Sequence, residues 1–219
     1  MGLLVIAAPD IGYPHESLST PAREEPTTRF EVFVASSCSP CVRDSYAVTT
    51  LPIAALRPSG FGPSVASMMA RGGEVRFEVV RAYPLGKVSQ QILVMRATLF
   101  TEAGAGQLYP ISTGLLDEGE VTALATAVTD ITKTASIRQA QEFTPHMTET
   151  EFRAGSVRVG TIRIQGAEVA YIQAGNVRSL RPPTAFETTH ALFLPVGDLP
   201  ALQNAIVQVE QRIQKLRRQ

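Results

Sequence analysis

Two stretches with the spacing of an amphipathic helix constrain this chain most. In the later one, apolar residues recur every three or four positions, at Leu202, Ile206, Val209, Ile213 and Leu216. This spacing draws one apolar stripe along an otherwise polar helix. Asp198 stands where an N-cap is expected, and Pro200 falls in the first turn, where a missing N–H costs nothing. Such a helix needs an apolar surface to cover, because packing supplies most of its stability.

The same arrangement occurs earlier in the chain. Asp117 and Glu120 have the three-residue spacing of a capping box. The apolar stripe that follows consists of Val121, Leu124, Val128, Ile131 and Ala135. Segments with the apolar patterns of β-strands precede each helix. The repetition indicates two copies of a β-rich unit, each closed by a helix.

The sequence therefore predicts an α+β protein with duplicated antiparallel β-sheet units. The units cover residues 73–135 and 148–217, and their helices cover the apolar side of the sheets. Together they form one predicted domain over residues 71–219.

Residues 1–70 differ from the rest, since they hold 8 of the 15 prolines and show no sustained periodicity. We expect an irregular or disordered arm there, with one short strand over residues 29–35. The paired Met68 and Met69 raise a further hypothesis, that residues 1–67 are a wrongly extended reading of the gene.

Arginines dominate the basic residues of the second unit. Between Glu151 and Arg181 the chain holds five arginines and two acids, which leaves a local excess of three positive charges. The arginines are Arg153, Arg158, Arg163, Arg178 and Arg181. In the second unit the apolar parity switches at Gly155 and Gly160, which predicts a bulge or kink at each glycine and turns the first three arginines outward.

An outward arginine row suits single-stranded nucleic acid, because guanidinium forks contact the backbone. The order of strands and capped helices over residues 73–217 also resembles the repeat of whirly single-stranded DNA binders. That resemblance implies nucleic-acid binding through the second sheet. The alternative is an ordinary solvated strand face.

Cys38 and Cys41 form a Cys-x-x-Cys motif after a predicted strand, as in thioredoxin-like proteins. A redox site of that kind needs a helix after the motif, but Val48 to Thr50 is a β-branched run followed by Pro52, which favours no helix. Two incidental cysteines are the alternative. Two thiols cannot complete a zinc site, and His15, His146 and His190 lie at no ligand spacing, so we expect no metal and no cofactor.

The formal net charge is zero, so no global field favours nucleic acid or an anionic membrane, and any such binding must come from a local patch. No apolar run is long enough to span a bilayer. We therefore expect no membrane partner, and the compartment stays open with the cytoplasm favoured.

Catalysis is disfavoured, because neither His146 nor His190 has a reactive partner at a motif spacing, and residues 102–106 lack the lysine of a phosphate-binding loop. The favoured function is a non-catalytic binding or interaction module, with a protein partner or self-association. Single-stranded nucleic acid binding is the first alternative, and thiol redox chemistry at Cys38 and Cys41 is the second.

Overall fold

The structure, a computed structural model, describes residues 28–58, 68–102, 106–139, 147–164, 167–175 and 191–219. Its elements in chain order are α1 (Arg29–Ser36), β1 (Cys41–Pro58), β2 (Met68–Pro84), the short 3-10 helix η2 (Val88–Gln90), β3 (Ile92–Glu102), β4 (Leu108–Asp117), α2 (Glu118–Gln139), β5 (Met147–Ala154), β6 (Val157–Ile164), β7 (Ala167–Ala174), β8 (Ala191–Leu194), the 3-10 helix η3 (Val196–Asp198) and α3 (Leu199–Arg217). None of the described helices is both long and apolar enough to cross a lipid bilayer.

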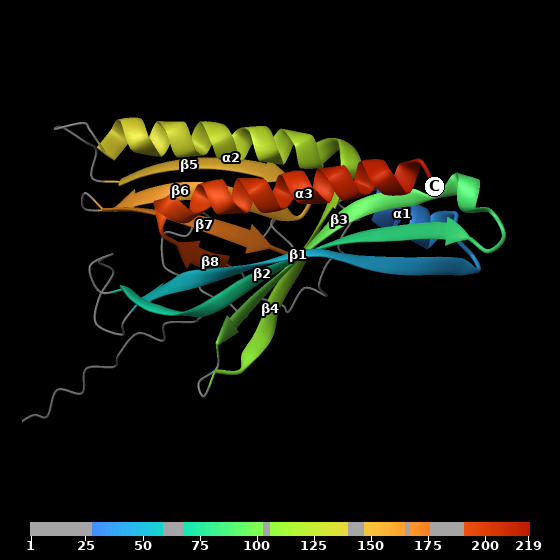
Figure 1. The fold of residues 1–219 in the computed structure, drawn as a ribbon, viewed down its shortest axis with the longest axis horizontal. Helices are drawn as coiled ribbons and strands as arrows, with labels where there is room; N and C mark the ends of the chain where they lie inside the picture. The colour runs from blue at the N-terminus through green and yellow to red at the C-terminus, as the bar shows by residue number, and fades with distance from the viewer. Residues whose placement is uncertain (1–27, 59–67, 103–105, 140–146, 165–166, 176–190) are drawn as a thin grey trace, which may run out of the picture.

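The strands form two antiparallel four-stranded units, each followed by a helix, as the sequence predicts. They join in the order β4-β3-β2-β1-β8-β7-β6-β5. Within each unit every strand pairs with the next one along the chain. The two units meet where Leu56 of β1 pairs with Phe193 of β8. The first strand of one unit and the last strand of the other therefore make the sheet continuous (Figure 1).

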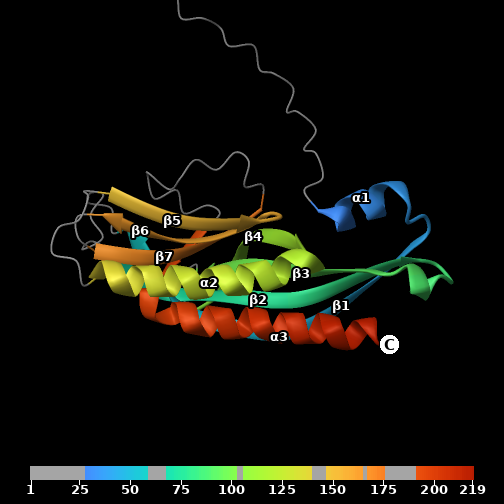
Figure 2. The same cartoon turned by 90° about the horizontal axis from the view of Figure 1, so that it is seen from above.

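The helices α2 and α3 lie side by side along one face of this sheet (Figures 1 and 2). All ten residues of the two predicted apolar stripes are buried, and Val128 and Val209 are fully so. All of them except Ala135 pack with Phe77, Met95 and Val159 of the sheet into one hydrophobic core. Each stripe thus has the apolar surface that its helix requires.

The prediction of an irregular arm is wrong for the part of it that the structure describes. β1 pairs with β2 from Cys41 to Pro58, with one irregularity between Ala47 and Thr49. Ile53 of β1 is buried in the core, and Tyr46 and Leu51 pack against it. The first unit therefore begins near residue 41 rather than residue 73, while residues 1–27 lie outside the described part of the chain.

The short strand expected over residues 29–35 is also wrong, because this segment forms helix α1. Thr28 caps the helix, since the Glu31 N–H donates to the Thr28 hydroxyl at 3.2 Å and the Thr28 N–H donates to the Glu31 carboxylate at 3.0 Å. This reciprocal pair is a capping box. Phe30 packs on Val80 and Val94, on the face of the sheet opposite α2 and α3.

The predicted bulge at Gly160 is absent. β6 pairs without a register shift on both sides, with Gly160 opposite Glu151 and Tyr171. Gly155, at φ +50°, instead makes the turn between β5 and β6. The apolar parity changes within β6 because the strand is buried on both faces: Val159 faces the helices, and Ile162 faces the other side.

Candidate binding groove

The ends of three helices converge on a groove of about 670 Å³. Its walls come from the first residue of α1, the junction of β4 with α2, the last turns of α3 and the start of β3. The polar residues that line it include Arg29, Gln91, Asp117, Glu118, Gln214 and Arg217. We call this cavity the helix-end groove.

Asp117 builds one wall of the groove by joining two elements. Its carboxylate accepts the backbone N–H of Arg29 at 2.8 Å and that of Phe30 at 3.4 Å. The first N–H groups of a helix have no partner within the helix, so a carboxylate satisfies them and complements the helix dipole. Asp117 therefore holds the start of α1 against the end of β4.

One of the two hydrogen bonds of the capping box predicted from Asp117 and Glu120 forms, and the Asp117 carboxylate bonds to α1 instead. The Glu120 carboxylate accepts the Asp117 N–H at 2.9 Å, as a capping box requires. It also accepts the Gly155 N–H at 3.1 Å, which ties the β5–β6 turn to the start of α2. The Asp117 side chain meanwhile serves α1, so each acid links α2 to another element.

The second acid of the groove is neutralised as well. Glu118 forms an ion pair with Arg217 of α3 at 2.7 Å. Arg29, in contrast, is exposed, and its guanidinium makes no ion pair within the described part of the chain. Among the described residues that line the groove, Arg29 is therefore the cation available to an incoming group.

An unused hydrogen-bond acceptor also lines this groove. The side-chain oxygen of Gln91 is inaccessible to solvent and accepts no hydrogen bond in the structure. Leaving a buried polar atom unpaired is unfavourable by about 1–3 kcal/mol. Gln91 lines the same groove as Arg29, and a bound donor would satisfy its side-chain oxygen once that side chain turns toward the groove.

A shallower groove of about 470 Å³ continues along α1 and shares Arg29 and Asp117 with the helix-end groove. It is lined by Val32 and Phe33, with the hydroxyls of Ser36 and Ser37 beyond them. An elongated ligand can therefore extend from the polar groove onto a mixed surface of α1.

Sequence reasoning missed this groove, because its residues come from segments far apart in the chain. Only the acids that follow β4 carried a signal, as the carboxylates of a helix N-terminus. Arg29, Gln91 and Gln214 share no motif. Their convergence depends on the register of β3 and on the length of α3.

The predicted arginine row does not form one surface. Arg158 and Arg163 are only 6% and 7% exposed, so the expectation that both project outward is wrong. Arg153 is exposed on the edge strand β5. Arg178 and Arg181 lie outside the described residues.

Arg158 and Arg163 also lie on opposite faces of β6, since their positions differ by an odd number of residues in a continuous strand. Arg163 lies on the helix side, where its guanidinium donates to the backbone carbonyl of Arg138 in α2 at 2.7 Å. Arg138 also lies 3.8 Å from the carboxylate of Glu168, whose side chain is 1% exposed. This buried polar cluster fixes the end of α2 on β6 and β7.

Arg158 lies on the other face, beside Tyr171. It forms an ion pair with Glu151 at 3.1 Å. The fully buried Tyr171 donates its hydroxyl to Glu149 at 2.7 Å, and Glu151 lies 3.3 Å from the same oxygen. Burial, followed by the hydrogen bond to Glu149, raises the pKa of Tyr171 far above its usual range.

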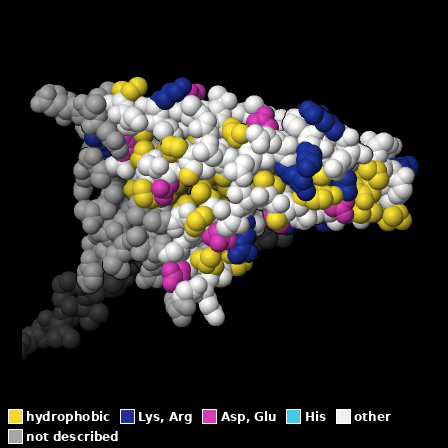
Figure 3. Space-filling model, viewed as in Figure 1, with side chains coloured by type: hydrophobic (Ala, Val, Ile, Leu, Met, Phe, Trp, Pro, Cys, Tyr) yellow, Lys and Arg dark blue, Asp and Glu magenta, His cyan; other side chains and the backbone are white. Residues whose placement is uncertain are grey.

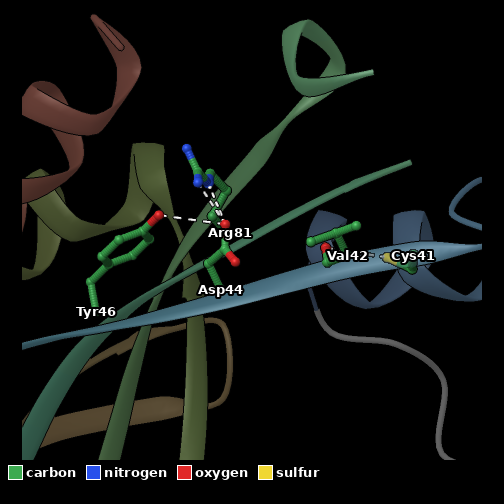
Figure 4. Close-up of polar contacts among 5 residues, drawn as sticks. All are labelled: Cys41, Val42, Asp44, Tyr46 and Arg81. Atoms are coloured by element: carbon green, nitrogen blue, oxygen red, sulfur yellow. Dashed lines mark hydrogen bonds and ion pairs between the residues drawn. The ribbon is translucent and has the colours of Figure 1, made fainter. Parts of the chain in front are cut away.

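A second cluster joins β1 and β2 to α3. Arg81 donates two hydrogen bonds to Asp44, at 2.6 and 3.0 Å, and the Tyr46 hydroxyl donates to the same carboxylate oxygen at 3.4 Å (Figure 4). The hydrogen bond to Asp44 raises the pKa of Arg81 above its usual value. Arg212 of α3 lies over the Tyr46 ring at 5.3 Å, so this cluster supports helix packing.

Cys38 and Cys41 form a disulfide between α1 and β1. Cys41 is the first residue of a strand, so the motif lies after a helix rather than before one. The helix N-terminus that activates the thiol in thioredoxin-like sites is therefore absent from these described elements. The disulfide instead ties the end of α1 to the start of β1.

Among the described residues, no group of three or more His, Cys, Asp or Glu side chains is placed to hold a metal ion. His15, His146 and His190 lie outside the described part of the chain. No protein-family model matches the sequence, and no curated protein matches it significantly.

Proposed function

We propose that this protein is a non-catalytic binding module that holds an acidic peptide segment in the helix-end groove. The observation that carries the proposal is an exposed cation, Arg29, which makes no ion pair with the described residues and lines the helix-end groove. Gln91, whose side-chain oxygen has no hydrogen-bond partner, lines the same groove. A carboxylate suits the guanidinium, and a peptide N–H suits the amide oxygen.

The size of the groove agrees with such a ligand, since pockets for small ligands span about 300–1,000 Å³ and this one has about 670 Å³. Its own acids do not repel an anionic ligand strongly. Asp117 is held by the N–H groups of α1, and Glu118 is paired with Arg217. The adjoining surface with Val32 and Phe33 then contacts an apolar residue next to the acidic one.

The experiment is an NMR titration of isotope-labelled protein with two capped peptides, Glu-Ala-Glu and Lys-Ala-Lys. We expect the acidic peptide to shift the signals of Arg29, Gln91 and Gln214, and the basic peptide to leave them unchanged. Arg29→Glu should abolish the shifts, because it reverses the free charge. Gln91→Leu should weaken the affinity for the acidic peptide by about three- to tenfold, which is the effect of one lost hydrogen bond.

Arg153→Glu is the matched control, since Arg153 is also an exposed arginine but lies on the edge strand β5. Its titration should equal that of the unchanged protein. Equal shifts with both peptides, or shifts that survive Arg29→Glu, would refute the assignment of the groove.

The two alternatives from the sequence stay predictions with weaker support. Arg158 and Arg163 are not available for nucleic-acid binding through the arginine row, because they are buried on opposite faces of β6. A redox function is compatible with the Cys38–Cys41 disulfide itself, but Cys38 is buried, and β1 rather than a helix follows the motif.

A further inference from the structure

The end of the molecule farthest from β8 carries two exposed apolar side chains. Leu85 is 66% exposed and Val88 is 44% exposed. Both belong to residues 84–90, which connect β2 to β3 and which we call the β2–β3 tip. Figure 3 shows hydrophobic side chains gathered at this end of the molecule, with Lys and Arg side chains beside them.

The tip is a built structure that holds Leu85 outward. The Lys87 N–H donates to the Pro84 carbonyl at 2.9 Å, and Gly86 has a φ of +77°, which together define a tight turn with Leu85 at its apex. The Leu85 N–H donates to the Pro40 carbonyl at 3.0 Å, which braces the turn against the start of β1. Exposing an apolar side chain on a braced turn is unfavourable in water, so this arrangement suits a partner that covers it.

Four cations lie around the tip, and none has a partner of opposite charge among the residues that the structure describes. Lys87 is in the turn, Arg43 lies two residues into β1, and Lys215 and Arg218 lie at the end of α3, beside the start of β3 (Figure 1). All four are exposed, and none makes an ion pair within the described ranges.

Two acids on the elements around the tip already have basic partners. Asp44 is paired with Arg81, and Glu118 is paired with Arg217. The tip therefore presents a local positive field, although the whole chain has a formal net charge of zero. The sequence-based expectation of no membrane partner depended on that total charge and on apolar run length, and neither quantity reports a patch of this kind.

We propose that the β2–β3 tip docks on an anionic lipid surface. Leu85 and Val88 enter the boundary between headgroups and acyl chains, and the four cations contact anionic headgroups. The shape favours lipid over protein, because the apolar side chains stand on a convex turn, whereas a specific protein interface needs about 800 Å² of complementary surface on each partner. Each cation near an anionic leaflet strengthens binding by about fivefold.

This inference is independent of the peptide groove, since it uses none of the residues assigned to that ligand. Its test is co-sedimentation of the full chain with vesicles of phosphatidylcholine alone and with vesicles that contain roughly one third phosphatidylserine, a strongly anionic composition. We expect binding to the anionic vesicles only, with loss at high salt because screening weakens the charge contribution.

Two sets of variants separate the apolar and electrostatic parts. Leu85→Ser with Val88→Ser should weaken binding by about tenfold, as expected for removing two partly buried aliphatic side chains. Arg43→Glu with Lys87→Glu should weaken it by at least about tenfold, because two favourable charges are reversed. Ile137→Ser is the matched control, since Ile137 is 63% exposed but lies near the far end of α2.

Absence of binding to the anionic vesicles would overturn the proposal, and so would equal binding to neutral vesicles. Polyglutamate is tested with the Arg29→Glu variant, in which the peptide groove is disabled. Binding of that variant to soluble polyglutamate that is lost on Arg43→Glu with Lys87→Glu but unaffected by Leu85→Ser with Val88→Ser would also overturn the proposal, and would assign the cations to an acidic polypeptide. Circular dichroism of each variant checks that a lost signal does not come from unfolding.

Discussion

Gly160 and Tyr171 depend on each other. A Cβ atom at position 160 would lie 2.6 Å from the Tyr171 hydroxyl and 2.5 Å from the Thr150 carbonyl oxygen, closer than real Cβ atoms approach. The missing side chain lets the tyrosine ring cross β6 and reach Glu149 on β5. The sequence predicts a bulge at Gly160, whereas in the structure the Tyr171 ring crosses β6 at this glycine.

Tyr171 makes the stability of the protein sensitive to alkali. Its pKa is raised in the folded state, so the fold retains a proton that the unfolded chain releases above about pH 10. The stabilising contribution is therefore complete below about pH 10 and is lost progressively at higher pH. We expect Tyr171→Phe to lower the free energy of unfolding by roughly 1.5–3 kcal/mol at neutral pH, since a buried hydrogen bond to a carboxylate is lost.

Between about pH 9 and 11 the same variant should lose less stability than the unchanged protein, because it no longer has this phenol. Urea denaturation at a series of pH values measures both effects. Tyr109→Phe is the control, since Tyr109 is 41% exposed and lies on β4. A parallel decline in both variants would show that burial of Tyr171 does not control the alkaline transition.

The burial of Arg158 and Arg163 could not be predicted from the residues alone. Arg158 alternates with Val157 and Val159, and this pattern correctly predicts that it points away from the helices. The prediction that this face is exposed to solvent is wrong. Ile162 and Tyr171, which lie on that face, are buried instead. Arg163 was predicted on the wrong face because a bulge was expected at Gly160, and a shift of one residue exchanges the two faces of a strand.

Helix α1 is an element whose type was predicted wrongly for an identifiable reason. Phe30, Val32 and Val34 alternate with other residues as in a strand, yet Thr28 and Glu31 have the spacing of a capping box. The reciprocal bonds of that box form in the structure and favour the helix. The two long helices were predicted correctly, because each carries a stripe of five periodic apolar residues that outweighs local ambiguity.

The attachment of α1 depends on Asp117, the β4 residue that accepts its first N–H groups. We expect Asp117→Ala to lower local stability by about 1 kcal/mol, the usual effect of losing a helix cap. Amide hydrogen exchange in α1 should then become about fivefold faster. Exchange within β2 should stay unchanged, since its ladder does not use Asp117.

Asp130→Ala is the control for this measurement, because Asp130 is an exposed acid on α2 that pairs only loosely with Lys133, at 3.8 Å. Its exchange pattern over α1 should match that of the unchanged protein. If Asp117→Ala left exchange in α1 unaltered, the hydrophobic contacts of Phe30 and the Cys38–Cys41 bond would be sufficient to hold the helix.

Considered as a whole, the molecule is a duplication joined through a strand that sequence patterns did not reveal. β1 contains Pro52 and lacks a clean alternation, so periodicity does not mark it, although the β-branched run from Val48 to Thr50 favours a strand. Its position becomes evident only from pairing, since β2 lies on one side of it and β8 on the other. Local sequence patterns predicted the two helices and most strands of the second unit. The pairing of β1 with β8 could be found only in the three-dimensional structure.

The hypothesis that the native chain begins at Met68 stays a prediction, and a chain that begins there would lack β1. The lost side chains include Ile53, Leu51 and Tyr46, which pack in or against the core. Full burial of one apolar side chain contributes about 1.5–3 kcal/mol, and Tyr46 and Leu51 are only partly buried, so these side chains together contribute several kcal/mol of the about 5–15 kcal/mol that stabilises a typical domain. We expect a chain that starts at Met68 to show no cooperative thermal transition, whereas the full chain melts in one step.

Adding a peptide of residues 41–58 should restore part of the transition, because β1 attaches to β2 through a continuous antiparallel ladder. A reversed-sequence peptide of the same composition serves as the control and should restore nothing. A cooperative transition of the shortened chain at the full chain's melting temperature would mean that β2 and β8 close the sheet without β1. The duplication would then be complete in residues 68–219, and the strand that now joins its halves would be an addition to it.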